Sequence, residues 1–599
     1  MCGIFGVSGS TPAVPLIAAG LKKLEYRGYD SSGIAVNGEK GIWLCKSAGS
    51  LSRLEKKLNQ SAPPLSSVGI GHTRWATHGK ATDLNAHPFL SADGMFAVAH
   101  NGIIENYTGL KAFLSEKGFS LVSDTDSEVV PMLLEYFYDG DVLKAIRRAV
   151  SELEGAFSLA IITSRAPDCV FAARKDSSLA IGCGKGCSFV SSDIPALSGF
   201  AEQCCIPDEN SVAVLRKGEI KLFDRQGNRT APSFKPTGEC GGDAEKGDFP
   251  FFMLKEIFSQ PRCLTDAAAQ FTDGKRLKKI LFSDEEANAF NRVKLIGCGS
   301  AYHAGVAGKN FIERLAGMFS VSLSHRHGDV LCDEKTLALF ISQSGETADT
   351  LFALRHAKAK GAATLAVVNT PLSSIAREAD KTVHTRAGTE IAVATTKGYT
   401  TQVLCLFAVA LLLGKARGTL PACEEHYVML NVPRAVRETL KLDDSLKAAA
   451  KSICRAQSVF FIGRGQDYAA AMEGALKLKE ISYINANAYA AGELKHGTIS
   501  LIESGTPVVA LATDGALFSK TMSNVEEVKA RGAETLLFTV SDAMSDDASP
   551  DRAVVLPHCG ELDIIPVSCA LQLLAYHAAN ELGRNVDKPR NLAKSVTVE

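Results

Sequence analysis

The sequence predicts a sheet-rich α+β half followed by two doubly wound α/β units, each built on a parallel sheet. Three observations support this prediction. Short strand-like apolar runs dominate the first half, strand–loop–helix segments dominate the second half, and the order of those segments recurs once. Between the halves, residues 225–250 form the longest polar run rich in glycine and proline, which indicates a linker.

The first half contains several runs that are typical of strands. The runs are residues 158–163, 169–174 and 212–223, whereas residues 127–140 show a helical pattern. Apolar runs of this length, bounded by turn residues, indicate half-buried or buried strands. The mixture predicts an α+β fold for this half.

The second half alternates strands and helices. After the linker, apolar strands followed by polar loops and helices occupy residues 293–317 and 337–361, and a further strand occupies residues 364–370. The same order returns at residues 458–482, 507–532 and 534–540. This alternation is typical of a doubly wound parallel sheet, and its return indicates an internal repeat.

Composition excludes several classes of protein. The 65 Lys and Arg nearly balance the 66 Asp and Glu, so there is no basic surface for nucleic acid and no polybasic membrane patch. The N-terminus lacks the pattern of a signal peptide, and the apolar run 403–414 is too short to span a bilayer. The 16 cysteines are scattered, without pairs at zinc spacing. We expect a cytoplasmic protein with reduced thiols, no metal and no cofactor, acting on small molecules.

Cys2 directly follows the initiator methionine. A small residue at position 2 normally allows the methionine to be removed, so the mature chain would begin with Cys2 and hold a free amine beside a thiol. An α-amino group has a pKa of about 7.7 to 8.0 and can accept a thiol proton near neutral pH. Such a nucleophile supplies its own base. The alternative is a buried, inert cysteine in an N-terminal strand.

A hydroxyl-rich loop follows one predicted strand of the second half. Ser342, Ser344 and Thr347 surround Gly345 where a helix begins. Free N–H groups at a helix start, together with hydroxyls, form an anion site. A solvated loop with a helix N-cap is the alternative. The position at the carboxyl end of a parallel strand favours phosphate.

Three further groups suit sugar chemistry. Glu473, Lys477 and Glu480 lie on one face of a predicted helix, either as a solvated stripe or as groups that move protons. His496 stands in a glycine-bounded loop, and histidine suits the opening of a sugar ring near pH 7. Lys594, in the terminal tail, is either a surface charge or a docked lysine that forms a Schiff base with a ketose.

Ten motifs, taken in order, resemble the glutamine:fructose-6-phosphate aminotransferase (isomerising) family, also called the glucosamine-6-phosphate synthases, along essentially the whole chain. They are "CGIFG", "LEYRGYDSSGIA", "GHTRWATHG", "NAHPF", "HNGIIEN", "SDTDSE", "SQSGETADT", "AGTEIAVATTKGYTTQ", "EGALKLKEISYINANAYAAGELKHG" and "PRNLAKSVTVE". The resemblance implies that L-glutamine is hydrolysed and its ammonia channelled to fructose 6-phosphate. The products would be L-glutamate and glucosamine 6-phosphate, in the first step of amino-sugar synthesis.

The resemblance also implies a domain order. An N-terminal-nucleophile glutaminase sandwich would occupy residues 2–240, and a linker with lead-in helices residues 241–284. Two doubly wound sugar isomerase (SIS) subdomains would occupy residues 285–430 and 450–590. A tail of residues 591–599 would enter the active site. The family further implies a homodimer.

In the glutaminase half, the resemblance assigns the catalytic roles to Cys2, as the nucleophile, and to Asn101 and Gly102, which would stabilise the oxyanion. The residues matching the family positions that bind glutamine are Arg74, Trp75, Thr77, His78 and Asp126. Trp75 and His87 match residues near the ammonia exit. A dry channel would keep ammonia unprotonated and nucleophilic.

In the isomerase half, the family positions for phosphate and sugar contacts are Ser342, Gln343, Ser344, Thr347, Val393 and Thr395. His496 would open the sugar ring and Lys594 would form the imine. Glu480 would move a proton between carbons 2 and 1, with Lys477 assisting nearby.

Two positions depart from the family pattern, and two alternatives remain. Ser300-Ala301 stands where the family usually has Thr-Ser, and Ser324-His325-Arg326 where it has Ser followed by an acidic residue. One alternative is another glutamine amidotransferase, which would need a phosphoribosyl diphosphate loop that we do not find. The other is a non-catalytic regulator that senses sugar phosphates, which gives no reason for Cys2 and Lys594.

Overall fold

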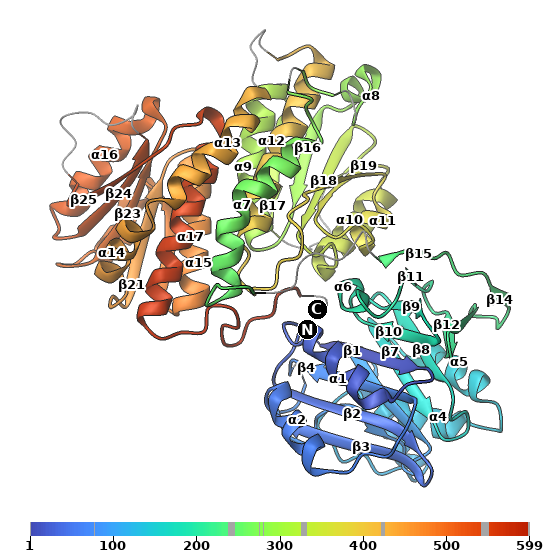
Figure 1. The fold of residues 1–599 in the computed structure, drawn as a ribbon. Helices are drawn as coiled ribbons and strands as arrows, with labels where there is room; N and C mark the ends of the chain where they lie inside the picture. The colour runs from blue at the N-terminus through green and yellow to red at the C-terminus, as the bar shows by residue number, and fades with distance from the viewer. Residues whose placement is uncertain are drawn as a thin grey trace. The chain divides into compact units, whose positions relative to one another are not determined.

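The computed structural model describes residues 2–76, 78–237, 246–274, 276–278, 281–324, 332–420, 426–540 and 550–596. The chain divides into two compact units, each described by itself below (Figure 1). The first unit comprises residues 1–243 and 593–599, and the second comprises residues 244–592.

The first unit is a sandwich of two antiparallel sheets. One sheet has the order β15-β11-β9-β10-β1-β4-β2-β3 and contains β1 (Gly3–Ser8), β2 (Ser31–Gly38), β3 (Gly41–Ala48), β4 (Val68–Arg74), β9 (Ala180–Gly184), β10 (Cys187–Ser191), β11 (Gln203–Cys205) and β15 (Lys235–Pro236). The other has the order β14-β13-β12-β8-β7-β6-β5 and contains β5 (Phe89–Leu90), β6 (Phe96–Gly102), β7 (Phe157–Thr163), β8 (Val170–Lys175), β12 (Val212–Arg216), β13 (Glu219–Phe223) and β14 (Arg229–Thr230).

A hydrophobic core joins the two sheets, and helices cover their outer faces. Ile70 of β4 and Ile162 of β7 belong to the same buried cluster between the sheets. The helices of this unit are α1 (Ala13–Leu24), α2 (Leu51–Gln60), α3 (Tyr107–Glu116), α4 (Val129–Phe137), α5 (Val142–Glu152) and α6 (Ile194–Leu197). Helix α1 approaches β4 closely because Gly71 has no side chain; a Cβ there would lie 2.4 Å from Cγ2 of Ile17.

The second unit contains two parallel five-stranded sheets with the same connectivity. The first has the order β17-β16-β18-β19-β20 and contains β16 (Arg292–Ile296), β17 (Phe319–Leu323), β18 (Thr336–Ser342), β19 (Ala363–Val368) and β20 (Lys381–His384). The second has the order β22-β21-β23-β24-β25 and contains β21 (Ser458–Gly463), β22 (Asn485–Ala490), β23 (Pro507–Ala512), β24 (Glu534–Val540) and β25 (Arg552–Leu556). This confirms the predicted doubly wound fold and its internal repeat.

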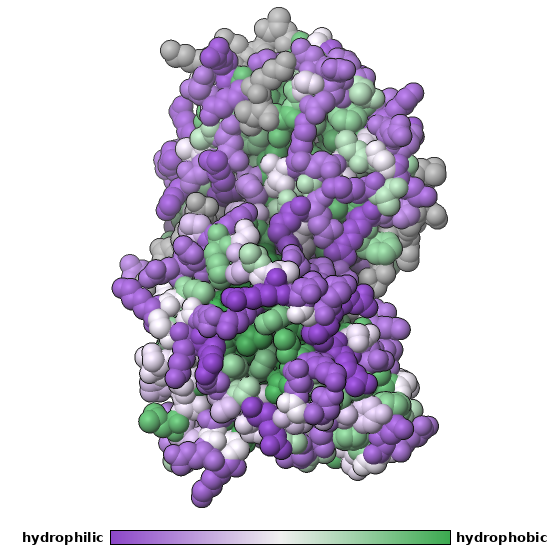
Figure 2. All heavy atoms as spheres, turned by 90° about the vertical axis from the view of Figure 1, so that its right-hand side faces the viewer, coloured by the Kyte–Doolittle hydropathy of each residue, from purple (hydrophilic) through white to green (hydrophobic). Residues whose placement is uncertain are grey.

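One continuous hydrophobic core spans both sheets of the second unit. Its helices are α7 (Phe252–Ala268), α8 (Asp284–Ala289), α9 (Ser300–Ala316), α10 (Ala348–Ala359), α11 (Ser374–Glu378), α12 (Lys397–Arg417), α13 (His426–Leu440), α14 (Asp443–Ile453), α15 (Gln466–Ser482), α16 (Gly515–Lys529) and α17 (Ile564–Glu581). Figure 1 shows α7, α15 and α17 between the two sheets. On the face in Figure 2, hydrophilic side chains predominate, as expected when the apolar ones fill these cores.

Two details differ from the sequence-based expectation. Helix α12 extends well beyond the apolar run 403–414, and both it and residues 560–581 are long and apolar enough to cross a membrane by length and composition. Their apolar stretches are 89% and 100% buried, as in core helices of globular proteins.

The second difference concerns the predicted linker. The polar run 225–250 is not all linker, because β14 and β15 pair at sheet edges. Two-residue strands are too short to show a hydrophobic period.

The two sheets of the second unit differ at one edge. In the first, β18 leads into the hydroxyl-rich loop before α10. In the second, the corresponding strand β23 leads to Thr513, whose N–H and Oγ1 donate to the carboxylate of Asp467 at 2.8 and 2.6 Å. Asp467 belongs to α15 and is buried. The hydrogen-bond donors of Thr513, at the end of β23, are therefore already engaged by a side chain of the protein.

Candidate functional site

In the first unit, Cys2 immediately precedes β1 and lies beside the end of β4. The Trp75 N–H donates to Sγ of Cys2 at 3.4 Å, and Sγ lies 3.5 Å from the Trp75 carbonyl oxygen. The antiparallel pairing of Gly3 with Thr73 sets this proximity. The thiol is therefore held against backbone groups of the segment that follows β4.

Asn101 and Gly102 are the last two residues of β6, a strand of the second sheet. Nδ2 of Asn101 donates to the Cys2 carbonyl at 3.1 Å. An amide NH₂ has two hydrogens, so one remains to meet an oxyanion. Gly102 has a φ of 120°, and a Cβ there would lie 2.0 Å from the Ala156 oxygen, so this position requires glycine.

The predicted glutamine-binding residues surround the same region. Arg74 is buried, and its guanidinium donates to the carbonyls of His78, Gly79 and Lys80. Asp126 is buried and accepts the Ile104 N–H at 2.9 Å. Thr77 lies outside the described residues. Arg74 therefore shapes the loop that follows Trp75.

Charges and burial compete at Arg74. Burial lowers the pKa of its guanidinium, whereas Cys2, Asp126 and Asp30 oppose that effect. Two of these three opposing groups, Cys2 and Asp126, are predicted site residues. Their influence on one cation shows that these groups share one electrostatic environment.

His87, predicted to lie near the ammonia exit, is buried within the first unit. Its Nδ1 accepts the His100 N–H at 3.2 Å, and its ring stacks on that of His72 with centroids 4.1 Å apart. Burial first, and neighbouring charges such as Arg74, lower the pKa of His87 well below its ordinary value. The ring is therefore neutral at pH 7, and its channel role stays a prediction.

Arg27 was missed as a candidate residue in the sequence. Its Nε donates to the Cys2 carbonyl at 3.2 Å, and its guanidinium pairs with Asp193 at 3.2 Å. Both Arg27 and Asn101 thus fix the backbone of Cys2. Arg27 lies within the motif "LEYRGYDSSGIA", so its place in that motif was the available signal.

In the second unit, the hydroxyl-rich loop has the predicted place between β18 and α10. Oγ of Ser342 lies 2.9 Å from Oγ1 of Thr347 and accepts the Gly345 N–H at 3.0 Å. Oγ of Ser344 accepts the Glu346 N–H at 3.2 Å. The three hydroxyls therefore hold a tight turn at the carboxyl end of a parallel strand, where anions bind in such folds.

Gln343 and Thr395, which belongs to the loop before α12, both lie close to Gly398. A Cβ at Gly398 would lie 2.7 Å from Oγ1 of Thr395 and 3.0 Å from Cγ of Gln343. The buried carboxylate of Glu390 accepts from Thr395 Oγ1 at 2.6 Å and from the Gly398 N–H at 3.0 Å. The structure thus brings two predicted sugar-contacting residues together.

Val393, the other predicted residue of this loop, is buried. Its N–H donates to the Asp587 carbonyl at 3.1 Å. The Asp587 carboxylate in turn accepts the N–H groups of Phe252 and Met253, at the start of α7. The loop before α12 is therefore tied to the segment that leads toward the C-terminal tail.

The row on α15 is buried rather than solvated. Nζ of Lys477 lies 3.4 Å from Oε1 of Glu473 and 2.7 Å from Oε2 of Glu480, and both Glu473 and Lys477 are 1% exposed. Glu480 remains 22% exposed. Lys477 therefore holds the one carboxylate of the row that stays accessible.

Helix α9 completes this buried cluster. Oγ of Ser300 donates to Glu473 at 2.8 Å and accepts from Lys477 at 3.1 Å, and Nδ1 of His303 lies 2.8 Å from the other Glu473 oxygen. Ser300, one of the departures from the family pattern, thus turns toward this cluster. His325 and Arg326, at the other departure, lie outside the described residues.

Opposite charges outweigh burial in the cluster. Burial alone would raise the pKa of Glu473, but Lys477 and the hydrogen bonds from His303 and Ser300 lower it. Burial alone would lower the pKa of Lys477, but Glu473 and Glu480 raise it. Both groups are therefore charged at pH 7, and Lys477 is unsuited to imine formation.

Two predicted residues remain, one in each unit. His496 is exposed, follows a short turn at Glu493–Lys495, and its N–H donates to the Glu493 carbonyl. Lys594 is half-buried and belongs to the first unit, whereas Glu480 belongs to the second. The roles of His496 and Lys594 stay predictions.

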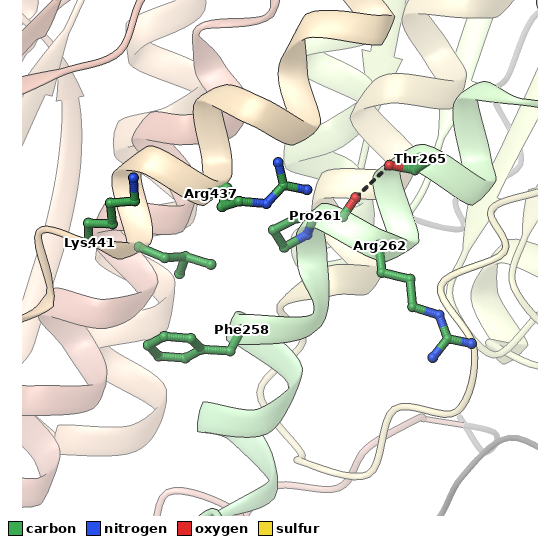
Figure 3. A pocket seen from close by; sticks show the side chains of 7 residues that line it. Phe258, Pro261, Arg262, Thr265, Arg437 and Lys441 are labelled. Atoms are coloured by element: carbon green, nitrogen blue, oxygen red, sulfur yellow. Dashed lines mark hydrogen bonds between the residues drawn. The ribbon is translucent and has the colours of Figure 1, made fainter.

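A separate cavity of about 420 Å³ lies between α7 and α13 (Figure 3). Its lining residues are Phe258, Pro261, Arg262, Thr265, Arg437, Leu440 and Lys441. Arg262 extends away from Lys441, and Thr265 donates to the Pro261 carbonyl at 2.9 Å. The lining includes none of the predicted site residues, so the candidate site is elsewhere.

Comparisons with known proteins agree with this division. A glutamine amidotransferase domain model matches residues 72–199, and an SIS domain model matches residues 288–412 and 452–579. The chain is 44% identical over 613 residues to the glutamine–fructose-6-phosphate aminotransferase (isomerizing) of Clostridium tetani and 45% identical over 611 residues to that of Symbiobacterium thermophilum, with 100% of each chain covered. The solved C-terminal domain of glucosamine-fructose-6-phosphate aminotransferase from Francisella tularensis matches with a TM-score of 0.55 and 34% identity, over 58% of this chain and 100% of that one.

Proposed function

The chain belongs to the family of glutamine–fructose-6-phosphate aminotransferases (isomerizing), and from this premise we propose which of its residues perform each step. The enzyme transfers the amide nitrogen of glutamine to fructose 6-phosphate and isomerises the product to glucosamine 6-phosphate. The observation that supports this most strongly is the placement of Cys2, whose thiol lies against Trp75 and whose carbonyl meets Asn101.

In the glutaminase half, Cys2 is the nucleophile and its own amine, freed by removal of the methionine, is the base. The thiolate attacks the side-chain carbonyl of glutamine, and Nδ2 of Asn101 and the N–H of Gly102 stabilise the oxyanion. Ammonia leaves, and water hydrolyses the thioester to glutamate. Arg74, Thr77, His78 and Asp126 form the site for the free amino acid, because an arginine suits its carboxylate and an aspartate its amine.

In the isomerase half, the loop from Ser342 to Thr347 binds the phosphate and Val393 and Thr395 contact the sugar. His496 opens the ring, and Lys594 forms an imine with the ketone, with loss of water. Ammonia then displaces the lysine, and Glu480 moves a proton from carbon 1 to carbon 2. Lys477 keeps Glu480 in place through their 2.7 Å ion pair.

The protein acts as a homodimer in the cytoplasm, as the family resemblance implies. The exposure of His496 supports the dimer, because a second copy would supply the surroundings that a ring-opening residue needs. The burial of α12 and of residues 560–581 is typical of core helices rather than of membrane spans. The decisive assay incubates the purified protein with glutamine and fructose 6-phosphate. We expect glutamate and glucosamine 6-phosphate in equal amounts, and the formation of neither would refute the proposal.

Replacement of Trp75 tests the transfer of ammonia. Trp75→Ala retains the backbone groups that meet Cys2 but removes the indole, so glutamine hydrolysis should continue while ammonia escapes to water. The ratio of glutamate to amino sugar should rise above one. The measurement is the two products from one reaction, and a ratio that stays at one would show that the indole only packs.

Lys594 and Glu480 are separable by trapping with borohydride, which reduces an imine to a stable amine. Lys594→Ala should prevent labelling of the protein by fructose 6-phosphate, because no imine forms. Glu480→Gln should allow labelling but stop turnover, because the imine forms without its proton carrier. Labelling that survives in Lys594→Ala would assign the imine to another lysine.

A further inference from the structure

His72 is a fully buried histidine of β4 to which no role has been assigned above. Its Nε2 lies 2.9 Å from the His100 carbonyl oxygen and 3.0 Å from Oδ1 of Asn101. Asn101 is the proposed oxyanion donor. This contact therefore connects His72 to the glutaminase site without any contact to Cys2 itself.

The chemistry of the acceptors fixes the orientation of both side chains. The Cys2 carbonyl can only accept, so the Asn101 atom 3.1 Å from it is the donor Nδ2, and Oδ1 faces His72. Because Oδ1 and the His100 carbonyl both accept, Nε2 of His72 must hold the hydrogen. Among the described residues, Nδ1 of His72 has no hydrogen-bond partner, which agrees with this tautomer.

Its surroundings keep His72 in this one state. Burial first, and then Arg74, lower the pKa of His72 to about 3, so the ring is neutral at pH 7. The His87 ring stacks on it at 4.1 Å with an angle of 13° between the planes. The tautomer, the charge and the plane of the ring are therefore all set by neighbours.

We propose that His72 is a positioning residue of the glutaminase, which holds Oδ1 of Asn101 so that Nδ2 points toward the carbon attacked by Cys2. This rests on the roles proposed for Cys2 and Asn101. If the amide rotated by half a turn, Oδ1 would face the oxyanion and repel it. A fixed amide acts without reorganisation at the moment of reaction.

The test compares two variants that differ in reach. In His72→Gln, the side-chain amide nitrogen can take the place of Nε2 and donate to Asn101. In His72→Asn, the shorter side chain places its amide nearer the position of Nδ1, so Asn101 loses its hydrogen-bond donor. We expect His72→Asn to lower kcat of glutamine hydrolysis by a factor on the order of 10 to 100. His72→Gln should restore most of the activity. KM for glutamine should change little, because the substrate-binding residues are untouched.

A second measurement separates positioning from folding. In an Asn101→Ala background, His72→Asn should cause no further loss of kcat, because the group that it positions is gone. The melting temperature of the first unit reports the folding of the half that contains His72. An equal loss in both backgrounds, or no rescue by His72→Gln in a folded protein, would refute the proposal. Full activity of Asn101→Ala would refute the role of Asn101 itself, and glutaminase activity in Cys2→Ala would refute the proposed function.

Discussion

Glutamate release should be abolished in Cys2→Ala, with kcat reduced by a factor on the order of 10⁴ to 10⁶. In the proposed mechanism the sulfur is the attacking atom, and the groups that hold Cys2, the Trp75 N–H at its sulfur and Nδ2 of Asn101 at its carbonyl, have no other nucleophile to act on. A variant that retains one extra residue before Cys2 should lose the same activity, because its amine becomes an amide that accepts no proton. The measurement is glutamate formed from glutamine alone.

The isomerase half supplies the control for both changes. Slow conversion of fructose 6-phosphate to glucose 6-phosphate needs no ammonia and should continue in both variants. A glutamine analogue with an electrophile should label Cys2 among the 16 cysteines and should label neither variant. Normal glutamate release in Cys2→Ala would contradict the mechanism. Loss of isomerisation in a folded Cys2→Ala protein would show that the two halves are not separable.

Lys477→Met should destabilise the second unit by about 3 to 5 kcal/mol, because it leaves the carboxylate of Glu473 buried without its cation. Amino-sugar formation should also be lost, since Glu480 loses the ion pair that positions it. The measurement is the shift of the denaturation midpoint together with turnover. Glutamine hydrolysis in the first unit should persist.

The helix offers a matched control for this change. Lys479 is two residues away on α15 and exposed, so Lys479→Met should change stability by no more than about 0.5 kcal/mol. The double variant Glu473→Gln, Lys477→Met removes both buried charges and should be more stable than Lys477→Met alone. If the double variant is the less stable of the two, an uncompensated Glu473 is not the cause of the loss.

Local patterns predicted the fold because each element is long enough to show its period. The parallel strands β16, β18, β21 and β23 and the helices that follow them were visible as apolar runs and polar loops. The two-residue strands β14 and β15 were not, since pairing rather than periodicity creates them. Helix α12 is buried on all sides, so its ends showed no amphipathic signal.

The site was predicted less completely, for a different reason. Spacing alone placed Glu473, Lys477 and Glu480 on one face, but nothing in that spacing indicated burial. Their partners Ser300 and His303 lie about 170 residues away in the sequence, on α9. His72 was likewise visible only as part of a motif. Contacts between distant elements depend on packing, which single-sequence reasoning does not reach.

The difference between the two parallel sheets of the second unit indicates how two copies of a repeated fold can have separate functions. One copy has a loop with three hydroxyl residues at the end of β18, while in the other the Asp467 carboxylate already accepts from the N–H and Oγ1 of Thr513 at the end of β23. A bound phosphate would meet this negative charge and find these donors taken. The end of β23 is therefore less suited to an anion than the end of β18, while helix α15 of the same copy carries Glu480. With the roles proposed for these residues, one repeated fold serves phosphate binding in its first copy and proton transfer in its second, and replacement of Asp467 is the first change needed to give the second copy an anion site.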